Sequence, residues 1–493
     1  MVERHDPKAF TKEVKGLCMS GSVVIPLWLA LLIGFFAVLS LLDRILVPGL
    51  RWIFRRRLNR VIDELNTRLK LRIQPFKLTK RQALIDRLVF DEEVMKAVEA
   101  RAEQENIPRE AVMKEVRRYA REIVPAFNAY AYFRIGARVA RWLSTLLYRV
   151  RLGYSDDESL RKVDRDSTVI FVMNHRSNMD YVLVTYMASA NSALSYAVGE
   201  WARVFMLQSI IRTMGAYFIR RDSRNDLYRK VLARYVHMAT KGGVTQAIFP
   251  EGGLSRDGAL REPKFGLFSY MVGDFDPDHE RDVVFIPVGL NYDRVLEDRI
   301  LTASQESEEK NKRRFRFADF LKFIGKNIWM KLRGRWYSYG YACVSFGHPL
   351  SLKAYLSERN MDFRKLDQAG RFGEIEKLGR YLMSEVGRVV PALPVSLASA
   401  AILQSMDEWI SEFELKARVS NYIQFIEGHG VHVHLPRMDR DYAVSTGLRM
   451  LTLRHLIEEK DGLYRANPKE TVLLSYYANA IAHLLPEKHL DNS

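Results

Sequence analysis

Between about residues 161 and 350, short apolar segments alternate with stretches of helical pattern, and this alternation constrains the fold more than any other feature. The apolar segments, rich in β-branched residues, are STVIFVM, ALSYAV, GAYFI, TQAIF, VVFIPVGL and ACVSFG. Strand-then-helix alternation is typical of α/β domains, because a helix that crosses over the sheet lets successive strands pair in parallel. We therefore predict an α/β domain whose central sheet is mostly parallel or mixed and is flanked by helices.

The regions on both sides of this domain show helical patterns. PREAVMKEVRRYAREIV has apolar positions at helical spacing and begins with a proline suited to a first turn. The C-terminal ETVLLSYYANAIAHLL is predicted to be a helix, and GVHVHLP a strand. We predict four regions: an N-terminal membrane-anchoring segment at 1–54, a helical membrane-surface region at 55–160, the α/β domain at 161–350 and a mostly helical C-terminal domain at 351–493.

Residues 23–42, VVIPLWLALLIGFFAVLSLL, contain no charged side chain. As a helix this run would be about 30 Å long, the hydrocarbon thickness of a bilayer. Arginines follow between Arg44 and Arg60, so the positive-inside rule favours a cytoplasmic C-terminal side. We predict attachment to the inner face of the cytoplasmic membrane; a buried core helix and a re-entrant hairpin are the alternatives.

Residues 133–151, FRIGARVARWLSTLLYRVR, have the pattern of a basic amphipathic helix. Basic residues lie near one helical face and apolar residues lie on another: Arg134, Arg138, Arg141 and Arg149 against Ile135, Val139, Trp142 and Leu146. Such a helix can lie on an anionic membrane surface, or it can pack its apolar face into a core. The spacing is equally consistent with both.

The chain carries 76 basic and 59 acidic residues, a net charge of +17, which favours anionic partners. Nucleic acid, anionic phospholipid, phosphorylated metabolites and an acidic carrier protein all qualify. The basic cluster at 310–326 is interleaved with phenylalanine and suits a membrane or an acidic carrier protein, although a solvated face is commoner. Two cysteines far apart, Cys18 and Cys343, predict no disulfide framework.

In a parallel α/β sheet, ligands bind beyond the carboxyl ends of the strands. The residues that follow the predicted strands are therefore the first candidates for chemistry. They are Asn174, His175 and Asp180 after VIFVM, Arg220 and Arg221 after GAYFI, Glu251, Gly252 and Gly253 after TQAIF, and Pro287, which is predicted to interrupt or end VVFIPVGL. At one edge they would bring together a base, two cations, a carboxylate and a rigid turn.

The segment NHRSNMD suits a base with an orienting carboxylate. A neutral imidazole accepts a proton, and a carboxylate on its other ring nitrogen fixes the tautomer and stabilises the imidazolium. His175 and Asp180 are five positions apart across a predicted loop-to-helix turn, so they can meet. Ser177 and Asp180 also form an S-x-x-D capping box, a purely structural explanation of the same residues. On spacing alone the two interpretations are even.

Two other groups suit a phosphorylated ligand that carries hydroxyl groups: Arg220 with Arg221, and Glu251, Gly252, Ser255 and Arg256 in FPEGGLSRDG. An arginine fork donates two parallel hydrogen bonds to phosphate, a carboxylate accepts from hydroxyls, and glycine lets the backbone approach closely. The structural alternatives are a solvated turn for the arginines and an ordinary Pro-Gly turn for the second group.

The segment EGHGVHVHLP places His429, His432 and His434 close together in the sequence. No third ligand type follows at a spacing characteristic of metal sites. We predict a structural role for these histidines and no metal.

The blocks NHRSNMDY, GAYFIRR, FPEGGLSRDG and VFIPVGLNYD, in this order, resemble the glycerolipid acyltransferase superfamily. Within it the chain is most similar to the bacterial membrane-bound glycerol-3-phosphate acyltransferases. The likeness extends through VSFGHPLSL and LLSYYANAIAHLL, and so covers the chain from about residue 167 to its end. The histidine-to-aspartate block and FPEGG are specific when both occur at this separation.

The resemblance implies roles by matching position: His175 as base, Asp180 as its partner, Arg220, Glu251, Gly252 and Arg256 as ligands of glycerol 3-phosphate, and Pro287 in acyl-donor or structural work. Two positions depart from the pattern. Asn178 stands where many relatives have a second histidine, and Leu254 where many have an arginine. Phosphate binding must therefore depend on other cations.

By resemblance, the activity is acyl transfer from an acyl-CoA or acyl-ACP thioester to the sn-1 hydroxyl of glycerol 3-phosphate. This reaction gives lysophosphatidate in the first step of phospholipid synthesis and needs no cofactor. An anionic phospholipid membrane is the expected surface. Dihydroxyacetone phosphate or lysophosphatidate as acceptor is the alternative within the same chemistry. A basic non-catalytic protein that binds nucleic acid or membrane is less favoured, because the membrane-length segment and the four blocks argue against it.

Overall fold

The computed structural model describes residues 73–486 and Pro26, with gaps at 190–192, 200–204, 221–222, 224, 307–338 (apart from Gly325 and Trp329), 432 and 434–438. The chain divides into two units, residues 1–63 and 64–493, and the continuous description belongs to the second unit. The predicted membrane run at 23–42 and the basic cluster at 310–326 lie outside the described residues, apart from Pro26 and Gly325. Among described residues, no helix is both long and apolar enough to cross a membrane. The four predicted regions stay a prediction.

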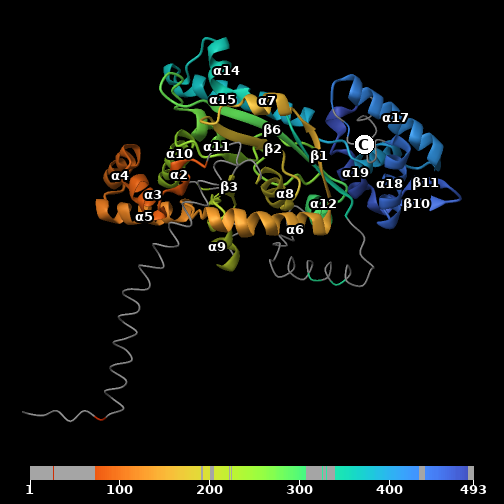
Figure 1. The fold of residues 1–493 in the computed structure, drawn as a ribbon, viewed down its shortest axis with the longest axis horizontal. Coiled ribbons are helices and arrows are strands. Elements are labelled where there is room, and N and C mark those ends of the chain that lie inside the picture. Colours follow the sequence, from red (N-terminus) through yellow and green to blue (C-terminus); the bar gives the residue numbers. More distant parts are fainter. Residues whose placement is uncertain are drawn as a thin grey trace, which may run out of the picture. The chain divides into compact units, whose positions relative to one another are not determined.

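In the described part of the chain, eight strands form one sheet in the order β1–β7–β6–β2–β5–β3–β4, with β8 paired to β6 (Figure 1). The strands from β6 to β4 are parallel, whereas β7 and β8 are antiparallel to β6, so the sheet is mixed. Their bounds are β1 Arg149–Ser155, β2 Thr168–Met173, β3 Ser195–Val198, β4 Tyr217–Phe218, β5 Gln246–Ile248, β6 Val283–Tyr292, β7 Tyr341–Phe346 and β8 Leu350–Ser351. The predicted α/β class is confirmed, and each of the six apolar segments contains a strand.

The centre of the sheet is the parallel pair β2 and β6, in which every residue is buried. A strand covered on both faces needs consecutive apolar side chains, which explains the continuous runs in this part of the sequence. Alternate residues enter different cores: Phe171 and Met173 join one cluster, and Ile170 and Val172 join the other. The carboxyl end of β2 is thus fixed from both sides.

Helices cover both faces of the sheet, and Figure 1 shows α6 and α15 on opposite sides of the strands. The cluster with Phe171 includes α6 (Ala137–Leu147), α8 (Met179–Ala188), α16 (Pro394–Leu403), α17 (Glu412–Gly428), α18 (Arg440–Leu453) and α19 (Thr471–Ala478). The cluster with Ile170 includes α3 (Arg81–Val89), α4 (Glu92–Glu105), α5 (Arg109–Ile123), α10 (Asp226–Lys241), α11 (Gly266–Val272), α14 (Leu352–Glu358) and α15 (Gln368–Arg388). The C-terminal helices therefore share a core with the sheet.

Shorter elements connect these layers. The helices are α2 (Pro75–Leu78), the π-helix η1 (Ala131–Gly136), α7 (Asp157–Lys162), α9 (Phe205–Thr213) and α12 (Asp298–Glu306), and the 3₁₀ turns are η3 (Phe363–Lys365), η5 (Pro468–Glu470) and η6 (Ala482–Leu484). A second sheet pairs β10 (Ile457–Lys460), β11 (Leu463–Ala466) and β9 (Ile410–Ser411) in the C-terminal part.

The predicted amphipathic helix at 133–151 is too long at its C-terminal end. Its helical part ends at Leu147, Tyr148 is extended, and Arg149 begins the edge strand β1, which pairs with β7. Within the helix, Ile135, Val139 and Trp142 are exposed. Leu146, the fourth residue of the predicted apolar face, is buried, so the core-packing alternative holds for Leu146 and not for the other three.

Two smaller expectations also change. The predicted C-terminal helix ends at Ala478 and is followed by the 3₁₀ turn η6; between them the Ala480 carbonyl accepts a hydrogen bond from Arg176. Pro287 lies inside β6 and does not end it: its carbonyl accepts from the Gly347 N–H, just beyond the last residue of β7. A proline is tolerated at this position because its nitrogen, which cannot donate a hydrogen bond, faces the side of β6 on which β7 has already ended. Of the predicted strand GVHVHLP, Val433 forms a bridge with Ala392, and most of the rest lies outside the described residues.

Candidate active site

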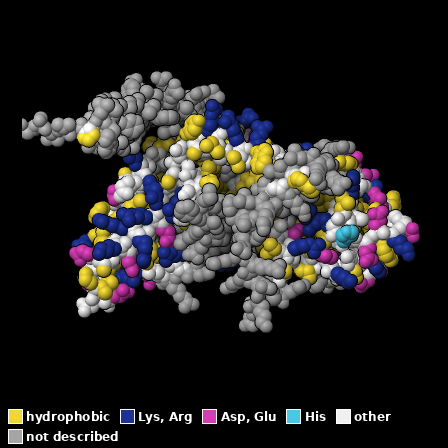
Figure 2. All heavy atoms as spheres, turned by 90° about the horizontal axis from the view of Figure 1, so that it is seen from below, with side chains coloured by type: hydrophobic (Ala, Val, Ile, Leu, Met, Phe, Trp, Pro, Cys, Tyr) yellow, Lys and Arg dark blue, Asp and Glu magenta, His cyan; other side chains and the backbone are white. Residues whose placement is uncertain are grey.

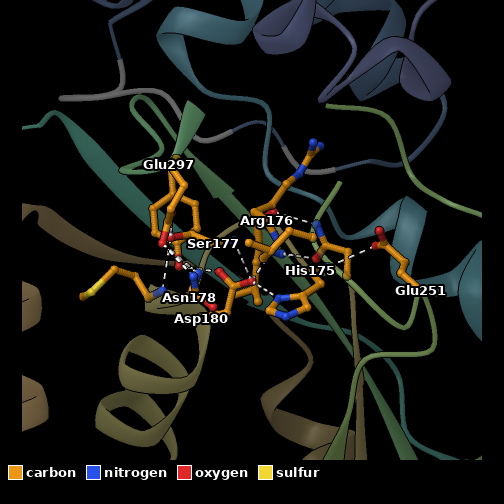
Figure 3. Close-up of polar contacts among 12 residues, drawn as sticks. His175, Arg176, Ser177, Asn178, Asp180, Glu251 and Glu297 are labelled. Atoms are coloured by element: carbon orange, nitrogen blue, oxygen red, sulfur yellow. Dashed lines mark hydrogen bonds and ion pairs between the residues drawn. The ribbon is translucent and has the colours of Figure 1, made fainter. Parts of the chain in front are cut away.

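The loop between β2 and α8 brings His175 and Asp180 together. Nδ1 of His175 lies 2.8 Å from Oδ2 of Asp180, and the two side chains are 2% and 0% exposed. Figure 3 shows the imidazole directed at the carboxylate, which lies inside the turn formed by the intervening residues. The pair that the spacing allowed is present and buried.

The Asp180 carboxylate also holds the turn closed. Oδ2 accepts hydrogen bonds from the backbone N–H groups of Arg176 (2.7 Å) and Ser177 (3.0 Å), and Oδ1 accepts from the Tyr292 hydroxyl (2.7 Å). The carboxylate therefore makes the Asp180 half of the predicted capping box as well as the contact to the imidazole. The role of His175 as a base stays a prediction. An acceptor surrounded by donors requires His175 to donate its Nδ1–H, so Nε2 is left as the basic nitrogen.

Aromatic contacts fix the plane of the His175 ring. Phe249, at the end of β5, stacks on it with centroids 4.1 Å apart. Tyr181, in the first turn of α8, meets it edge-on at 5.5 Å. The ring therefore has little freedom to leave the carboxylate.

The FPEGG segment wraps the backbone of His175. Oε1 of Glu251 accepts from the His175 N–H at 3.0 Å, and the Ser255 N–H donates to the His175 carbonyl at 3.1 Å. Glu251 is buried, and desolvation raises its pKa to about 7. Within the described residues its Oε2 is buried and has no hydrogen-bond partner.

The other residues predicted from this segment differ in exposure and partners. Gly252 has a φ of 67°, and a Cβ there would lie 2.9 Å from Cδ of Lys264, so the turn requires glycine. The Ser255 hydroxyl is placed to donate to the Ala259 carbonyl at 2.8 Å or to Asp257, which gives it a structural partner. Arg256 is exposed.

Arg220 lies beyond β4, at the edge of the sheet, and β3 and β5 separate β4 from β2. Its guanidinium forms a two-pronged pair with Glu122 of α5, at 2.9 and 2.7 Å, and lies over the rings of Tyr119 and Tyr228. The structure thus assigns Arg220 a partner that spacing did not suggest. Its predicted role as a phosphate ligand stays a prediction, and Arg221 lies outside the described residues.

An apolar cavity of about 620 Å³ adjoins the His175 loop. Its walls come from η1, α6, α8 and α9 and include Tyr132, Val139, Tyr181 and Ile211. Asn178 and Glu297 lie in its lining, where the cavity meets the loop. Tyr181 joins the two features, because it lines the cavity and contacts the His175 ring.

Two family models match the chain in succession. The first, for acyltransferases, matches residues 154–291, and the second, the glycerol-3-phosphate acyltransferase C-terminal region, matches residues 328–488. The chain is thus similar to acyltransferases over the first range and to the C-terminal region of glycerol-3-phosphate acyltransferases over the second. The predicted resemblance is therefore confirmed.

Curated relatives agree with this assignment. A glycerol-3-phosphate acyltransferase from Aeromonas hydrophila is 28% identical over 83% of this chain and 50% of its own length, and one from Ectopseudomonas mendocina is 27% identical over 83% and 49%. The chain thus spans about half the length of the curated relatives it matches. A solved 1-acyl-sn-glycerophosphate (LPA) acyltransferase from Thermotoga maritima aligns with a TM-score of 0.28 at 17% identity, over 51% of this chain and 77% of that one.

The ranges matched by the two family models meet at a residue that the sequence analysis did not select. Arg176 is 2% exposed, and it donates to the carbonyls of Gly258 and, at 2.9 Å, Ala480. Figure 3 shows its side chain directed away from the His175 ring. An arginine in a polar loop gives no signal of burial, because its acceptors come from distant segments.

Glu297 was missed for another reason. It follows β6 and is buried beside the His175 loop, with Ser177 and Asn178 as its partners (Figure 3). The rule that ligands gather beyond the strand ends applies to β6 as well and would have selected this carboxylate. Of the histidines predicted to be structural, His429 contacts the Phe425 carbonyl at 2.8 Å, and His432 and His434 lie outside the described residues.

Proposed function

We propose that this chain transfers a fatty acyl group from an acyl-CoA or acyl-ACP thioester to the sn-1 hydroxyl of glycerol 3-phosphate. The observation that carries the proposal is the buried His175–Asp180 pair beside an apolar cavity. A base with a fixed tautomer suits deprotonation of a hydroxyl, and an apolar cavity suits an acyl chain. The names of the matched relatives support glycerol 3-phosphate as the acceptor.

In the proposed reaction, Nε2 of His175 takes the proton of the acceptor hydroxyl as its oxygen attacks the thioester carbonyl carbon. Asp180 stabilises the imidazolium, and its contacts to the turn keep it in place. The carbon–sulfur bond then breaks, and the thiolate leaves and takes up a proton. The acceptor attacks directly, so no acyl-enzyme forms and no cofactor takes part.

For the acceptor, the proposal depends on the segment that wraps His175. The unpartnered Oε2 of Glu251 can accept from a glycerol hydroxyl, Gly252 leaves room for close approach, and exposed Arg256 can meet the phosphate. Arg220 and the Ser255 hydroxyl have protein partners and contribute less to this part of the proposal.

We propose that the acyl chain enters the cavity beside α6 and that the membrane surface contacts the same helix. Ile135, Val139 and Ile210 line the cavity and are also exposed at 58%, 52% and 59%. Exposed arginines on the same helix suit anionic headgroups. Figure 2, which shows the molecule from the side of α6, has apolar side chains beside Lys and Arg on this face. A site on the inner face of the cytoplasmic membrane would receive acyl chains from lipid and phosphates from water.

The test is release of free coenzyme A from palmitoyl-CoA, with and without glycerol 3-phosphate. We expect release that depends on the acceptor, and we expect His175→Ala to abolish it. Labelled acyl transfer to dihydroxyacetone phosphate and lysophosphatidate, in competition with glycerol 3-phosphate, decides the acceptor.

The matched control is His348→Ala. His348 forms a pair with Asp156 at the same 2.8 Å, but its side chain is 70% exposed. Loss of activity in the His175 variant alone supports the proposal. Normal turnover by a folded His175→Ala protein, or equal loss in both variants, would remove His175 as the base.

A further inference from the structure

Glu297 is a buried carboxylate that the reaction described above does not use. It lies in the segment between β6 and α12 and is 5% exposed. β6 is the direct parallel neighbour of β2, so the segments that follow the two strands emerge side by side. This position brings Glu297 to the outer side of the His175–Asp180 turn.

The contacts of Glu297 are directed at the two residues in the middle of that turn. Oε2 accepts from the Ser177 hydroxyl at 2.7 Å, and Oε1 accepts from Asn178, at 3.3 Å from its backbone nitrogen and 3.1 Å from Nδ2. Asp180 binds the backbone of the same turn from the inside. One carboxylate on each side therefore holds the turn that aligns Asp180 with His175 (Figure 3).

The hydrogen bonds from Ser177 and Asn178 offset the cost of burying the Glu297 carboxylate. Desolvation raises the pKa of Glu297, and the hydrogen bonds from Ser177 and Asn178 act against it. Its hydrogen-bond donors among the described residues are neutral groups of the turn. A buried carboxylate that depends on the turn for its donors also restricts the turn, because movement of either leaves polar groups unsatisfied.

The C-terminal region holds the segment that carries Glu297. Arg454 of the α18 C-terminus binds Asp298 at 2.5 Å and the Tyr477 hydroxyl at 2.8 Å. That hydroxyl also donates to Asp298 and accepts from the Val295 N–H at 3.1 Å. Both sides of Glu297 are therefore attached to α18 and α19.

We infer that Glu297 is a positioning residue for the His175–Asp180 pair, and that the C-terminal region acts on catalysis by holding Glu297 through Arg454, Asp298 and Tyr477. This inference rests on the proposed acyl transfer and assigns the C-terminal region a task within it. Glu297 contacts neither reacting atom. Its effect passes through Ser177 and Asn178 to the orientation of Asp180.

The decisive variant is Glu297→Gln, which keeps the volume and loses one of the two acceptor oxygens. We expect kcat to fall about 10²-fold, the cost of a misplacement of about 1 Å, with little change in KM for glycerol 3-phosphate. We also expect the acid limb of the kcat profile to move to lower pH, because the imidazolium loses part of its carboxylate contact. A purely structural role would reduce the active fraction equally at every pH.

Glu280→Gln is the matched control. Its side chain is 9% exposed and pairs with Lys241 at 2.9 Å, outside the site. Arg454→Met tests the C-terminal link, with Arg234→Met, which removes the pair with Asp91, as its control. We expect Arg454→Met to change kcat and the pH profile in the same direction as Glu297→Gln, and the two controls to leave both unchanged.

Hydrogen exchange separates this inference from the proposed function. We expect the amides of residues 176–178 to exchange faster in Glu297→Gln than in the unmodified chain, whether or not the chain transfers acyl groups. Unmodified protein that fails to acylate glycerol 3-phosphate removes the proposed function. Unchanged exchange, or an active Glu297→Gln variant with an unmoved pH profile, overturns the positioning role.

Discussion

Two of the described histidine–aspartate pairs share the same nitrogen–oxygen distance but have different surroundings. In both, the His Nδ1 lies 2.8 Å from the Asp Oδ2. The side chains of His175 and Asp180 are 2% and 0% exposed, whereas those of His348 and Asp156 are 70% and 19% exposed. An exposed pair contributes about 0–1 kcal/mol, because water competes for both partners. Removing one partner of a buried pair leaves an uncompensated buried charge, which is strongly destabilising. Two pairs with the same distance can therefore differ greatly in energy, and the distance alone does not distinguish them.

The carboxylates of the two pairs also differ in their other contacts. Asp180 accepts from two backbone N–H groups and a tyrosine hydroxyl in addition to the imidazole. Asp156 is the N-cap of α7 and accepts from the Ser159 N–H. The first carboxylate organises a turn around a histidine, and the second begins a helix beside one.

The largest expected effect tests this comparison directly. Asp180→Asn should lower kcat by about 10⁴-fold, because an amide that donates to Nδ1 forces the tautomer whose Nε2 carries the proton. Asp156→Asn should leave kcat unchanged. Both are measured by coenzyme A release, with thermal unfolding to confirm that each variant is folded. If kcat of Asp180→Asn falls by less than about tenfold, the buried pair contributes as little to catalysis as the exposed pair.

The second expected effect is a pH dependence of folding stability caused by the buried Glu251. Burial raises its folded-state pKa to about 7, above the usual 4.5, so the folded state binds the proton more tightly than the unfolded state does. Stability should therefore fall as pH rises from 4.5 to 7, by at most about 3 kcal/mol. Glu251→Gln should remove this dependence, so its melting temperature relative to the unmodified chain should be higher at pH 8 than at pH 5.

Asp156 is expected to give the opposite pH dependence of stability. Its hydrogen bonds to His348 and Ser159 lower its pKa, so its stabilising contribution is present above the ordinary carboxylate range and is lost as the pH falls below it. Asp156→Asn should therefore reduce stability slightly at neutral pH and not in acid. Equal pH dependence in the two variants would contradict the contrast between the sites.

A third ion pair, intermediate in burial, sharpens the comparison. The side chains of Arg220 and Glu122 are 32% and 14% exposed. Arg220→Lys cannot reproduce the two-pronged contact and should lower the free energy of unfolding by about 1 kcal/mol. A double-mutant cycle with Glu122→Gln measures the coupling by denaturant unfolding. If Arg220→Lys instead raises KM for glycerol 3-phosphate without loss of stability, the phosphate role implied by resemblance is correct.

The parts that could be predicted from the sequence are local. The six strand segments contain their own apolar pattern, and His175 and Asp180 are separated by only five positions. The pairings that could not be predicted join distant positions: Glu122 is 98 positions from Arg220, and Glu297, although it follows β6, is 120 positions from its partner Ser177. Periodicity and turn chemistry carry no information about contacts at such separations.

The helix predicted at 133–151 shows how a local pattern can mislead. Arg149 and Arg151 alternate with Val150 and Leu152, which is a strand period, but they continue a segment of helical period. Only pairing with β7, almost two hundred residues later, makes the strand favourable at this point. Strand β1 was therefore concealed by the helical pattern that precedes it.

The smallest expected effect concerns an exposed cation, Arg256, which follows the FPEGG segment. Arg256→Gln should leave stability unchanged, because an exposed side chain loses little when its charge is removed. It should raise KM for glycerol 3-phosphate by roughly two- to fivefold, the equivalent of about 0.5–1 kcal/mol for an exposed charge contact. The difference between Arg256→Gln and the unmodified chain should shrink at high salt, which screens such contacts. An unchanged KM at low salt would mean that phosphate recognition depends on other cations.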